Sequence, residues 1–309
     1  MDNLPRAVRE EVERAEILLQ SLVGEEIPTI SINSLDPDEA PFLGLITSKL
    51  SPMIGNLIER RITAILHDEE AEHGMRWVRQ DPGFPDAVLV DRNGNPTSAG
   101  YEVKAWYALS TELTGRFRES VNLLAPRNVR VVVVGWVMSH LVYGTPTVIG
   151  VLSTDALDVA GQRDRHYHRP PDYLCVEPRN TAHRTSNLQQ TNVAGYKFQE
   201  TASDRVDAAR QLAESSPGFG SPSHEARAQE MAEELMNAFA YRLDTNFAKI
   251  DRIDHPQIEA FKTRVLATDF EGRQLSEWVR VLKNLTGDND RKRKEATSIL
   301  HTVYNGHQI

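Results

Sequence analysis

The chain has 309 residues, of which 40% are hydrophobic and 26% charged, with a formal net charge of -9 and a single cysteine. At about 100–200 residues per domain, this length predicts about two domains. One cysteine excludes an internal disulfide, and the absence of any CxxC or Cys/His cluster argues against structural zinc. No apolar run reaches the ~18 residues that span a membrane, and the acidic N-terminus is unlike a secretory signal, so we expect a cytoplasmic protein.

The charge is unevenly distributed along the sequence. Residues 1–46 hold ten acidic side chains and three arginines, whereas residues 104–200 hold eleven basic and eight acidic side chains. Because a polyanion is attracted by local basic surface rather than by net charge, we expect such a partner to meet the middle of the chain. The alternative is a solvated surface whose charges happen to fall this way.

The first half of the chain begins with helical patterns and then changes character. Hydrophobic spacing predicts an amphipathic helix over 4–22 and, after a connector rich in Pro and Asp, a longer helix over 48–73. A β-branched run at 87–90, a strong turn signal at 91–96 and a second strand at 100–106 predict an antiparallel hairpin.

The next segments predict a layered α/β fold. Residues 110–124 have helical spacing, and the nearly continuous apolar run at 129–138 is typical of a strand buried on both faces. Further strands are expected at 148–152 and 173–176. The order of helices and strands predicts an α/β fold with a mixed β-sheet flanked by helices. After residue 200 the strand signal ends, and helices are expected at about 203–214, 224–250, 256–267, 273–285 and 289–304.

One group of residues in the predicted hairpin points to chemistry. Pro85-Asp86 opens the first strand, and Glu102-Val103-Lys104 lies on the second, where strand alternation places Glu102 and Lys104 on the same face. Two carboxylates a few Å apart favour a cation between them, and an all-oxygen site suits Mg²⁺, with Mn²⁺ as a substitute. A neighbouring lysine can stabilise a phosphate oxygen or help deprotonate a water molecule. The alternative is an exposed hairpin in which Glu102 and Lys104 form a surface pair.

This spacing resembles the active site of the PD-(D/E)xK nuclease superfamily, and within it the type II restriction endonucleases. The resemblance covers roughly residues 48–140 and depends on a short motif. It implies a restriction-endonuclease-like core with a metal bound by Asp86, Glu102 and the Val103 carbonyl, and with Lys104 acting on the attacking water. With the pattern of helices and strands, it divides the chain into an N-terminal helical arm at 1–46, a catalytic and DNA-recognition core at 47–200, and a helical subdomain at 201–309 that is a candidate for dimerisation.

The family often adds an acid from the helix before the hairpin. Glu59 and Glu70 share one edge of the predicted 48–73 helix, beside its apolar stripe. We rank Glu59 first, since Glu70 belongs to a run of four acids that is typical of a solvated segment. A solvated helix flank is an equally good interpretation of both residues.

A polar stretch at 163–199 is the candidate for DNA recognition. It is rich in Arg, His, Asn, Gln and Thr, which are side chains that read base edges in the grooves of DNA. A polar surface loop is the alternative, although long loops without function are uncommon in compact domains. The candidates for base or phosphate contacts are Arg184, Ser186, Asn187, Gln189, Gln190 and Asn192, and those for phosphate contacts are Arg163, Arg165, Arg169 and Lys197.

The sequence therefore predicts a Mg²⁺-dependent, sequence-specific endonuclease of the restriction type, part of a restriction-modification system, that cuts double-stranded DNA. No P-loop motif occurs, so no nucleotide cofactor is expected. A palindromic target needs two active sites related by a two-fold axis, which predicts a homodimer with the helical tail or the 4–22 helix as its contact surface. The alternatives are a structure-specific repair or recombination nuclease and a non-catalytic DNA-binding protein.

Overall fold

A computed structural model was used to examine these expectations. It describes most of the chain, including the whole predicted hairpin. The described residues are 4–33, 36–67, 74–80, 83–110, 112–113, 115–166, 173–178, 195–200, 202–215, 226–243, 250 and 253–306.

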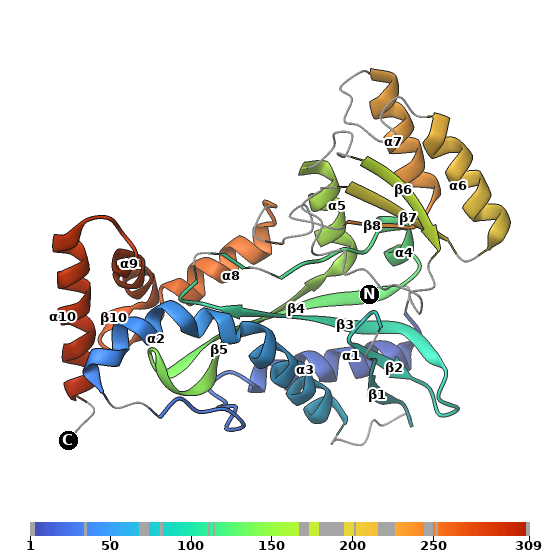
Figure 1. Cartoon of the computed structure of the whole chain (residues 1–309). Coiled ribbons are helices and arrows are strands. Elements are labelled where there is room, and N and C mark those ends of the chain that lie inside the picture. Colours follow the sequence, from blue (N-terminus) through green and yellow to red (C-terminus); the bar gives the residue numbers. More distant parts are fainter. Residues whose placement is uncertain are drawn as a thin grey trace. The chain divides into compact units, whose positions relative to one another are not determined.

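The chain divides into two compact units, and each is described by itself. Unit 1 comprises residues 1–113, 130–154 and 256–309, and unit 2 comprises 114–129 and 155–255. Unit 1 is built on a five-stranded sheet (Figure 1). Its helices are α1 (Arg6–Ser21), α2 (Ala40–Ile46), α3 (Ser51–His67), α8 (Pro256–Leu266), α9 (Leu275–Leu285) and α10 (Asp290–Gly306), with 3-10 turns at Pro37–Glu39 and Thr47–Leu50.

The main sheet has the strand order β1-β2-β3-β4-β5 and is mixed. The β1–β2 and β2–β3 pairs are antiparallel. The Ala108 amide, just after β3, donates to the carbonyl of Trp136 near the end of β4, so β3 and β4 run in the same direction. The strands are β1 (Arg76–Arg79), β2 (Ala87–Val90), β3 (Pro96–Tyr107), β4 (Asn128–His140) and β5 (Tyr143–Asp155), and a small ribbon pairs β9 (Asp269–Phe270) with β10 (Arg273–Gln274).

The core of unit 1 lies on both faces of β4. Its apolar side chains from Val129 to Met138 are at most 3% exposed, as the apolar run predicted. On one face of the sheet the α1 carboxylate of Glu16 is bonded to Arg130 of β4 and Ser153 of β5. On the other face the ring of Phe261 from α8 lies against Gly135, where a Cβ would be 3.7 Å from it. The α/β fold with a mixed sheet between helices is therefore confirmed.

Two helices cover the same face of the β1–β3 part of the sheet, and they lie below β3 in Figure 1. The hydroxyl of Tyr101 in β3 donates to the Val12 carbonyl of α1. Gly55 of α3 lies 3.6 Å, measured from an ideal Cβ, from the side chain of Ala105. Because Tyr101 and Ala105 share one face of β3, α1 and α3 pack on that face and leave the alternate residues of β3 for the other.

A buried carboxylate ties α1 to the edge strand β1. Glu11 is 4% exposed, and its Oε1 accepts a hydrogen bond from Trp77 Nε1 at 2.9 Å. The same carboxylate is bonded to Arg14, whose Nη2 lies 2.6 Å from Oε1. The Trp77 ring in turn packs against Tyr101 with 4.9 Å between ring centroids. Burial beside Glu16 raises the pKa of Tyr101 well above its usual value.

Replacing Glu11 with alanine is expected to lower the free energy of unfolding by about 2–3 kcal/mol, since Trp77 Nε1 and Arg14 both lose their buried acceptor. Denaturant unfolding measures the change. Glu10→Ala is the matched control: Glu10 pairs with Arg6, whose side chain is 89% exposed, so solvent screens the pair and stability should hardly change. Equal effects of the two variants would contradict this role of Glu11.

Unit 2 contains a three-stranded sheet of order β6-β7-β8. The β6–β7 pair is parallel and the β7–β8 pair antiparallel. A small apolar core joins helices α6 and α7 to the sheet, built from Ala209, Ala213, Leu235, Phe239 and Tyr241. The elements are α4 (Val121–Leu124), α5 (Ala156–His166), β6 (Tyr173–Pro178), β7 (Gly195–Glu200), α6 (Ser203–Ser215), α7 (Ala226–Ala238) and β8 (Tyr241–Leu243).

Several sequence-based predictions of secondary structure were wrong. In the predicted 110–124 helix only Val121–Leu124 is helical among the described residues. Leu113 and Phe117 are buried, but Gly115 lacks helix propensity and its carbonyl accepts from Ile250. The polar stretch at 163–199 is also more structured than expected, since α5 reaches His166 and β7 begins at Gly195. The helix predicted at about 224–250 ends at Ala238, and the strand β8 follows it within the predicted range. Like the two-residue strands β9 and β10, β8 is too short to show an alternating pattern and was missed.

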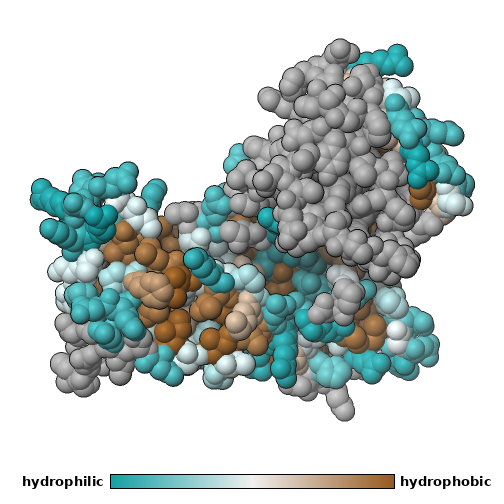
Figure 2. All heavy atoms as spheres, viewed as in Figure 1, coloured by the Kyte–Doolittle hydropathy of each residue, from teal (hydrophilic) through white to brown (hydrophobic). Residues whose placement is uncertain are grey.

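Within the described part of the chain, no helix is long and apolar enough to cross a membrane. Figure 2 shows an apolar area over α2 and its neighbouring segments. Three large apolar side chains of α2 and the start of α3 are well exposed: Phe42 at 60%, Leu45 at 42% and Met53 at 55%.

Candidate active site

The predicted catalytic residues meet where β2 begins, beside β3. The two strands pair through Ala87 with Tyr101 and Val88 with Gly100, so Asp86 stands opposite Glu102, just before the first residue of β2. The Asp86 side chain takes the place of a backbone partner for β3, because its Oδ2 accepts the Val103 amide at 2.7 Å.

Gly100 allows the chain to approach β3 closely at this point. A Cβ on Gly100 would lie 2.3 Å from Cγ of Pro85 and 3.0 Å from the Ala87 carbonyl oxygen. Such contacts are far shorter than side chains tolerate, so any larger residue would push Pro85 and the neighbouring Asp86 away from β3. Pro85, Asp86 and Gly100 thus form one structural unit that fixes the first carboxylate.

Glu102 and Lys104 lie on the same face of β3, as alternation predicted. Lys104 Nζ is 2.5 Å from Glu102 Oε1 and donates to the Val103 carbonyl oxygen at 3.1 Å. Their side chains are 14% and 12% exposed, which is partly buried but within reach of a ligand. A surface pair on a solvated hairpin would be far more exposed.

The face that carries this pair is opposite to the one covered by α1 and α3. Trp106 follows Lys104 on it, is 2% exposed and packs against Phe261 of α8, with 6.2 Å between ring centroids. The Glu102–Lys104 pair therefore lies next to the apolar core beneath α8. Tyr107 points the other way and packs against Trp136 at 4.7 Å, and burial raises the pKa of its hydroxyl. Trp106 and Tyr107 are core residues.

The oxygen atoms at this point suit a hard divalent cation. Asp86 Oδ2 accepts the Val103 amide, and the Lys104 ammonium contacts both the Glu102 carboxylate and the Val103 carbonyl. The three oxygen-bearing groups therefore gather around Glu102 and Val103 of β3. Mg²⁺ binds through one or two carboxylates, keeps several waters and accepts carbonyl oxygen. No three His, Cys, Asp or Glu side chains gather as ligands among the described residues, so water and the Val103 carbonyl would complete the set.

Glu59 lies elsewhere and has another partner. It projects from α3, on the face of the sheet opposite to Glu102, and its Oε1 accepts from Arg79 Nε of β1 at 2.6 Å. Arg79 pairs with Ala87, which in turn pairs with Tyr101, and these three residues share that face. The structure therefore does not bring Glu59 together with Asp86 and Glu102. Glu70 lies outside the described residues.

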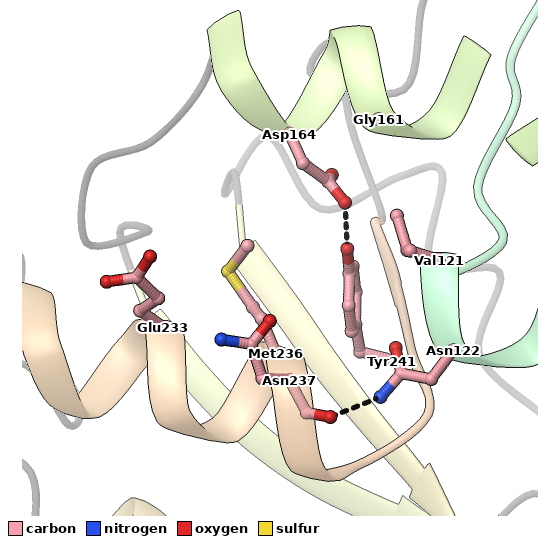
Figure 3. A pocket seen from close by; sticks show the side chains of 8 residues that line it. All are labelled: Val121, Asn122, Gly161, Asp164, Glu233, Met236, Asn237 and Tyr241. Atoms are coloured by element: carbon pink, nitrogen blue, oxygen red, sulfur yellow. Dashed lines mark hydrogen bonds between the residues drawn. The ribbon is translucent and has the colours of Figure 1, made fainter. Parts of the chain in front are cut away.

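Arg163, a predicted phosphate contact, is instead held inside unit 2. It is 1% exposed, and its guanidinium donates to Asp164 Oδ1 at 2.9 Å and to the Phe117 carbonyl at 3.0 Å. Asp164 also accepts from the Tyr241 hydroxyl (Figure 3). A phosphate cannot reach a guanidinium buried in this way, so Arg163 stabilises the packing of α5 against β8.

The other candidates for DNA contact are placed only in part. Arg165 belongs to α5, and Lys197 lies in the central strand β7, opposite Cys175 and Arg242. The remaining predicted residues lie outside the described ones: Arg169, Arg184, Ser186, Asn187, Gln189, Gln190 and Asn192.

Unit 2 also holds a cavity of 630 Å³ beside the Arg163 network. Its lining comes from α4, α5, α7 and β8, and no residue of the predicted catalytic set contributes. Figure 3 shows the lining residues Val121, Asn122, Gly161, Asp164, Glu233, Met236, Asn237 and Tyr241.

Sequence reasoning missed a groove in unit 1, between α3 and β1. It is lined from both sides by basic residues, namely Arg60, His67, Arg76 and Arg79. The only sequence signal was a set of arginines at 60, 61, 76 and 79, which are interspersed with acids and separated along the chain.

Comparisons of the chain with models of known protein families, with curated proteins and with solved structures found no match. A function therefore has to be inferred from the geometry of Asp86, Glu102 and Lys104 and from the spacing of the motif that they form.

Proposed function

We propose that the chain is a metal-dependent endonuclease that hydrolyses phosphodiester bonds of double-stranded DNA, of the type II restriction class. The observation that carries this proposal is the convergence of Asp86, Glu102, the Val103 carbonyl and Lys104 at the start of β2. Two acids and a lysine held together beside β3, partly buried yet open to a ligand, are suited to metal-assisted hydrolysis.

The charge of each residue determines its proposed role. Asp86 and Glu102 are the carboxylates that would hold Mg²⁺, and the Val103 carbonyl adds a neutral oxygen. When bound, the ion lowers the pKa of a water molecule and neutralises charge on the scissile phosphate. Lys104 donates from Nζ, which orients the attacking water or stabilises a phosphate oxygen as negative charge develops. The water oxygen forms a bond to phosphorus, the bond to a sugar oxygen breaks, and that oxygen takes up a proton.

Plasmid DNA tests the proposal. Incubation with Mg²⁺ is expected to give discrete fragments from a restriction-type enzyme, and none in the presence of a chelator. Nicking or smearing would instead favour a repair or recombination nuclease. Binding of DNA without cleavage under Mg²⁺ and Mn²⁺ would leave the non-catalytic interpretation and contradict the proposal.

We also expect a homodimer, because a palindromic duplex presents two equivalent scissile bonds about a two-fold axis. The exposed Phe42 and Leu45 of α2 are candidates for the contact, since apolar side chains this exposed favour burial against a second copy. Sedimentation should show a dimer for the wild type and a shift to monomer for Phe42→Ser with Leu45→Ser. Val23→Ser, which alters an exposed apolar residue after α1, is the control. A monomeric wild type that cuts both strands at once would contradict the expectation.

A further inference from the structure

The groove between α3 and β1, here called the α3–β1 groove, is a second feature of unit 1 with a definite chemistry. It has a volume of 460 Å³. Six of its lining residues carry the argument: Arg60, Thr63 and His67 from α3, and Arg76, Val78 and Arg79 from β1.

The groove has more positive than negative charge among the described residues. Arg79 is neutralised by Glu59 at 2.6 Å. Arg60 and Arg76 are both exposed, and within the described ranges neither forms a hydrogen bond or ion pair. His67 is held in place because its Nδ1 donates to the Trp77 carbonyl at 3.2 Å, an oxygen that can only accept. Among the described residues, the guanidinium groups of Arg60 and Arg76 are therefore available to bind an anionic ligand.

The groove opens at the edge of the sheet. β1 is the terminal strand, so alternate backbone amides point away from β2 toward the groove. Backbone amides and guanidinium groups are the donors that proteins use most on phosphate oxygens. Val78 contributes apolar lining, and the Thr63 hydroxyl donates to the Glu59 carbonyl within α3 at 2.8 Å.

The groove is connected to the candidate active site through β1. Gln80, the residue after Arg79, donates its amide to the Asp86 carbonyl at 2.8 Å. Strand alternation places Arg76 on the face that carries Glu102 and Lys104, and Arg79 on the face covered by α3. Arg76 pairs with Val90, at the end of β1 away from Asp86, so a polyanion on the active-site face would reach Arg76 at the far end of the hairpin and Arg60 across the edge of β1.

We infer that the α3–β1 groove binds phosphate groups of the DNA backbone away from the scissile bond, through Arg60 and Arg76. The inference rests on the proposed function, because it takes the polyanion to be the nuclease substrate. It reconciles the net charge of -9 with DNA binding, since affinity for phosphate is concentrated in a local basic groove. These contacts position DNA without reading its sequence.

The test compares the salt dependence of DNA binding in matched double variants. Arg60→Ala with Arg76→Ala removes the two proposed contacts, and Arg280→Ala with Arg291→Ala removes two exposed arginines of α9 and α10 at the same cost in net charge. Binding of a fluorescent duplex without divalent metal is measured by anisotropy between low and moderate salt. Each lost phosphate contact lowers the slope of log K against log salt by about 0.9, so the first variant should lose about 1.8.

The outcomes separate this inference from the proposed function. A reduced slope in the Arg60 and Arg76 variant alone supports the groove, with the loss of affinity equal for unrelated duplex sequences. An unchanged slope, or equal losses in both variants, overturns it even if the wild type cuts DNA. Groove-dependent binding by a wild type that never cuts DNA overturns the proposed nuclease and leaves the groove standing. A wild type that binds no duplex overturns both.

Discussion

Replacing Lys104 with alanine is expected to lower the rate of DNA cleavage by about 10²–10³-fold while leaving the affinity for DNA nearly unchanged. The reason is that Nζ contacts both Glu102 and the Val103 carbonyl, and a single preorganised donor at a developing charge contributes about this factor. Single-turnover cleavage at saturating enzyme, with binding measured separately, separates the loss in rate from any loss in affinity.

Lys262→Ala is the matched control for this variant. Lys262 of α8 is also ion-paired and is 17% exposed, close to the 12% of Lys104, with its Nζ 3.2 Å from Glu259. If activity depended on stability alone, the two variants should lose activity alike, because each loses a largely buried lysine. Cleavage at the wild-type rate by Lys104→Ala, or an equal loss in Lys262→Ala, would remove Lys104 from the reaction.

Much of the fold and of the candidate site could be predicted because it is local in sequence. The alternation of Glu102 and Lys104 follows from strand geometry once the 100–106 strand is recognised. The turn at 91–96 sets the hairpin, and Asp91 closes it by accepting the amides of Asn93 and Asn95. The apolar run at 129–138 predicts its own burial. These signals depend on neighbours within a few residues, so a single sequence contains them.

The features that could not be predicted depend on tertiary pairing. A helical wheel places Glu59 beside the apolar stripe of α3, but only packing decides that it meets Arg79 of β1 and not the hairpin acids. Arg163 looks like a surface arginine until Asp164 and the Phe117 carbonyl surround it. Pro85 packs closely on Gly100, fifteen positions further along the chain, and neither residue type predicts this contact.

Replacing Asp86 with asparagine is expected to abolish Mg²⁺-dependent cleavage, with a loss of at least about 10³-fold, because a carboxylate that holds the metal contributes several kcal/mol to transition-state stabilisation. Asparagine keeps an oxygen that can accept the Val103 amide, so the hairpin and the position of residue 86 should be retained. The variant thus removes charge from the site while keeping its shape. Isothermal titration with Mg²⁺ or Mn²⁺ should show weakened binding, and denaturant unfolding should show nearly wild-type stability.

Asp91→Asn is the control within the same hairpin. Asp91 also accepts backbone amides, and the hydrogen bonds from Asn95 lower the pKa of its carboxyl, but it lies in the turn at the far end of β2. If a negative charge anywhere on the hairpin were sufficient, the two variants would lose activity together. Loss in Asp86→Asn alone, accompanied by weaker metal binding, would locate the metal at the start of β2. Undiminished cleavage by Asp86→Asn would show that the hairpin carboxylate is structural, because its hydrogen bond to Val103 would then be its whole contribution.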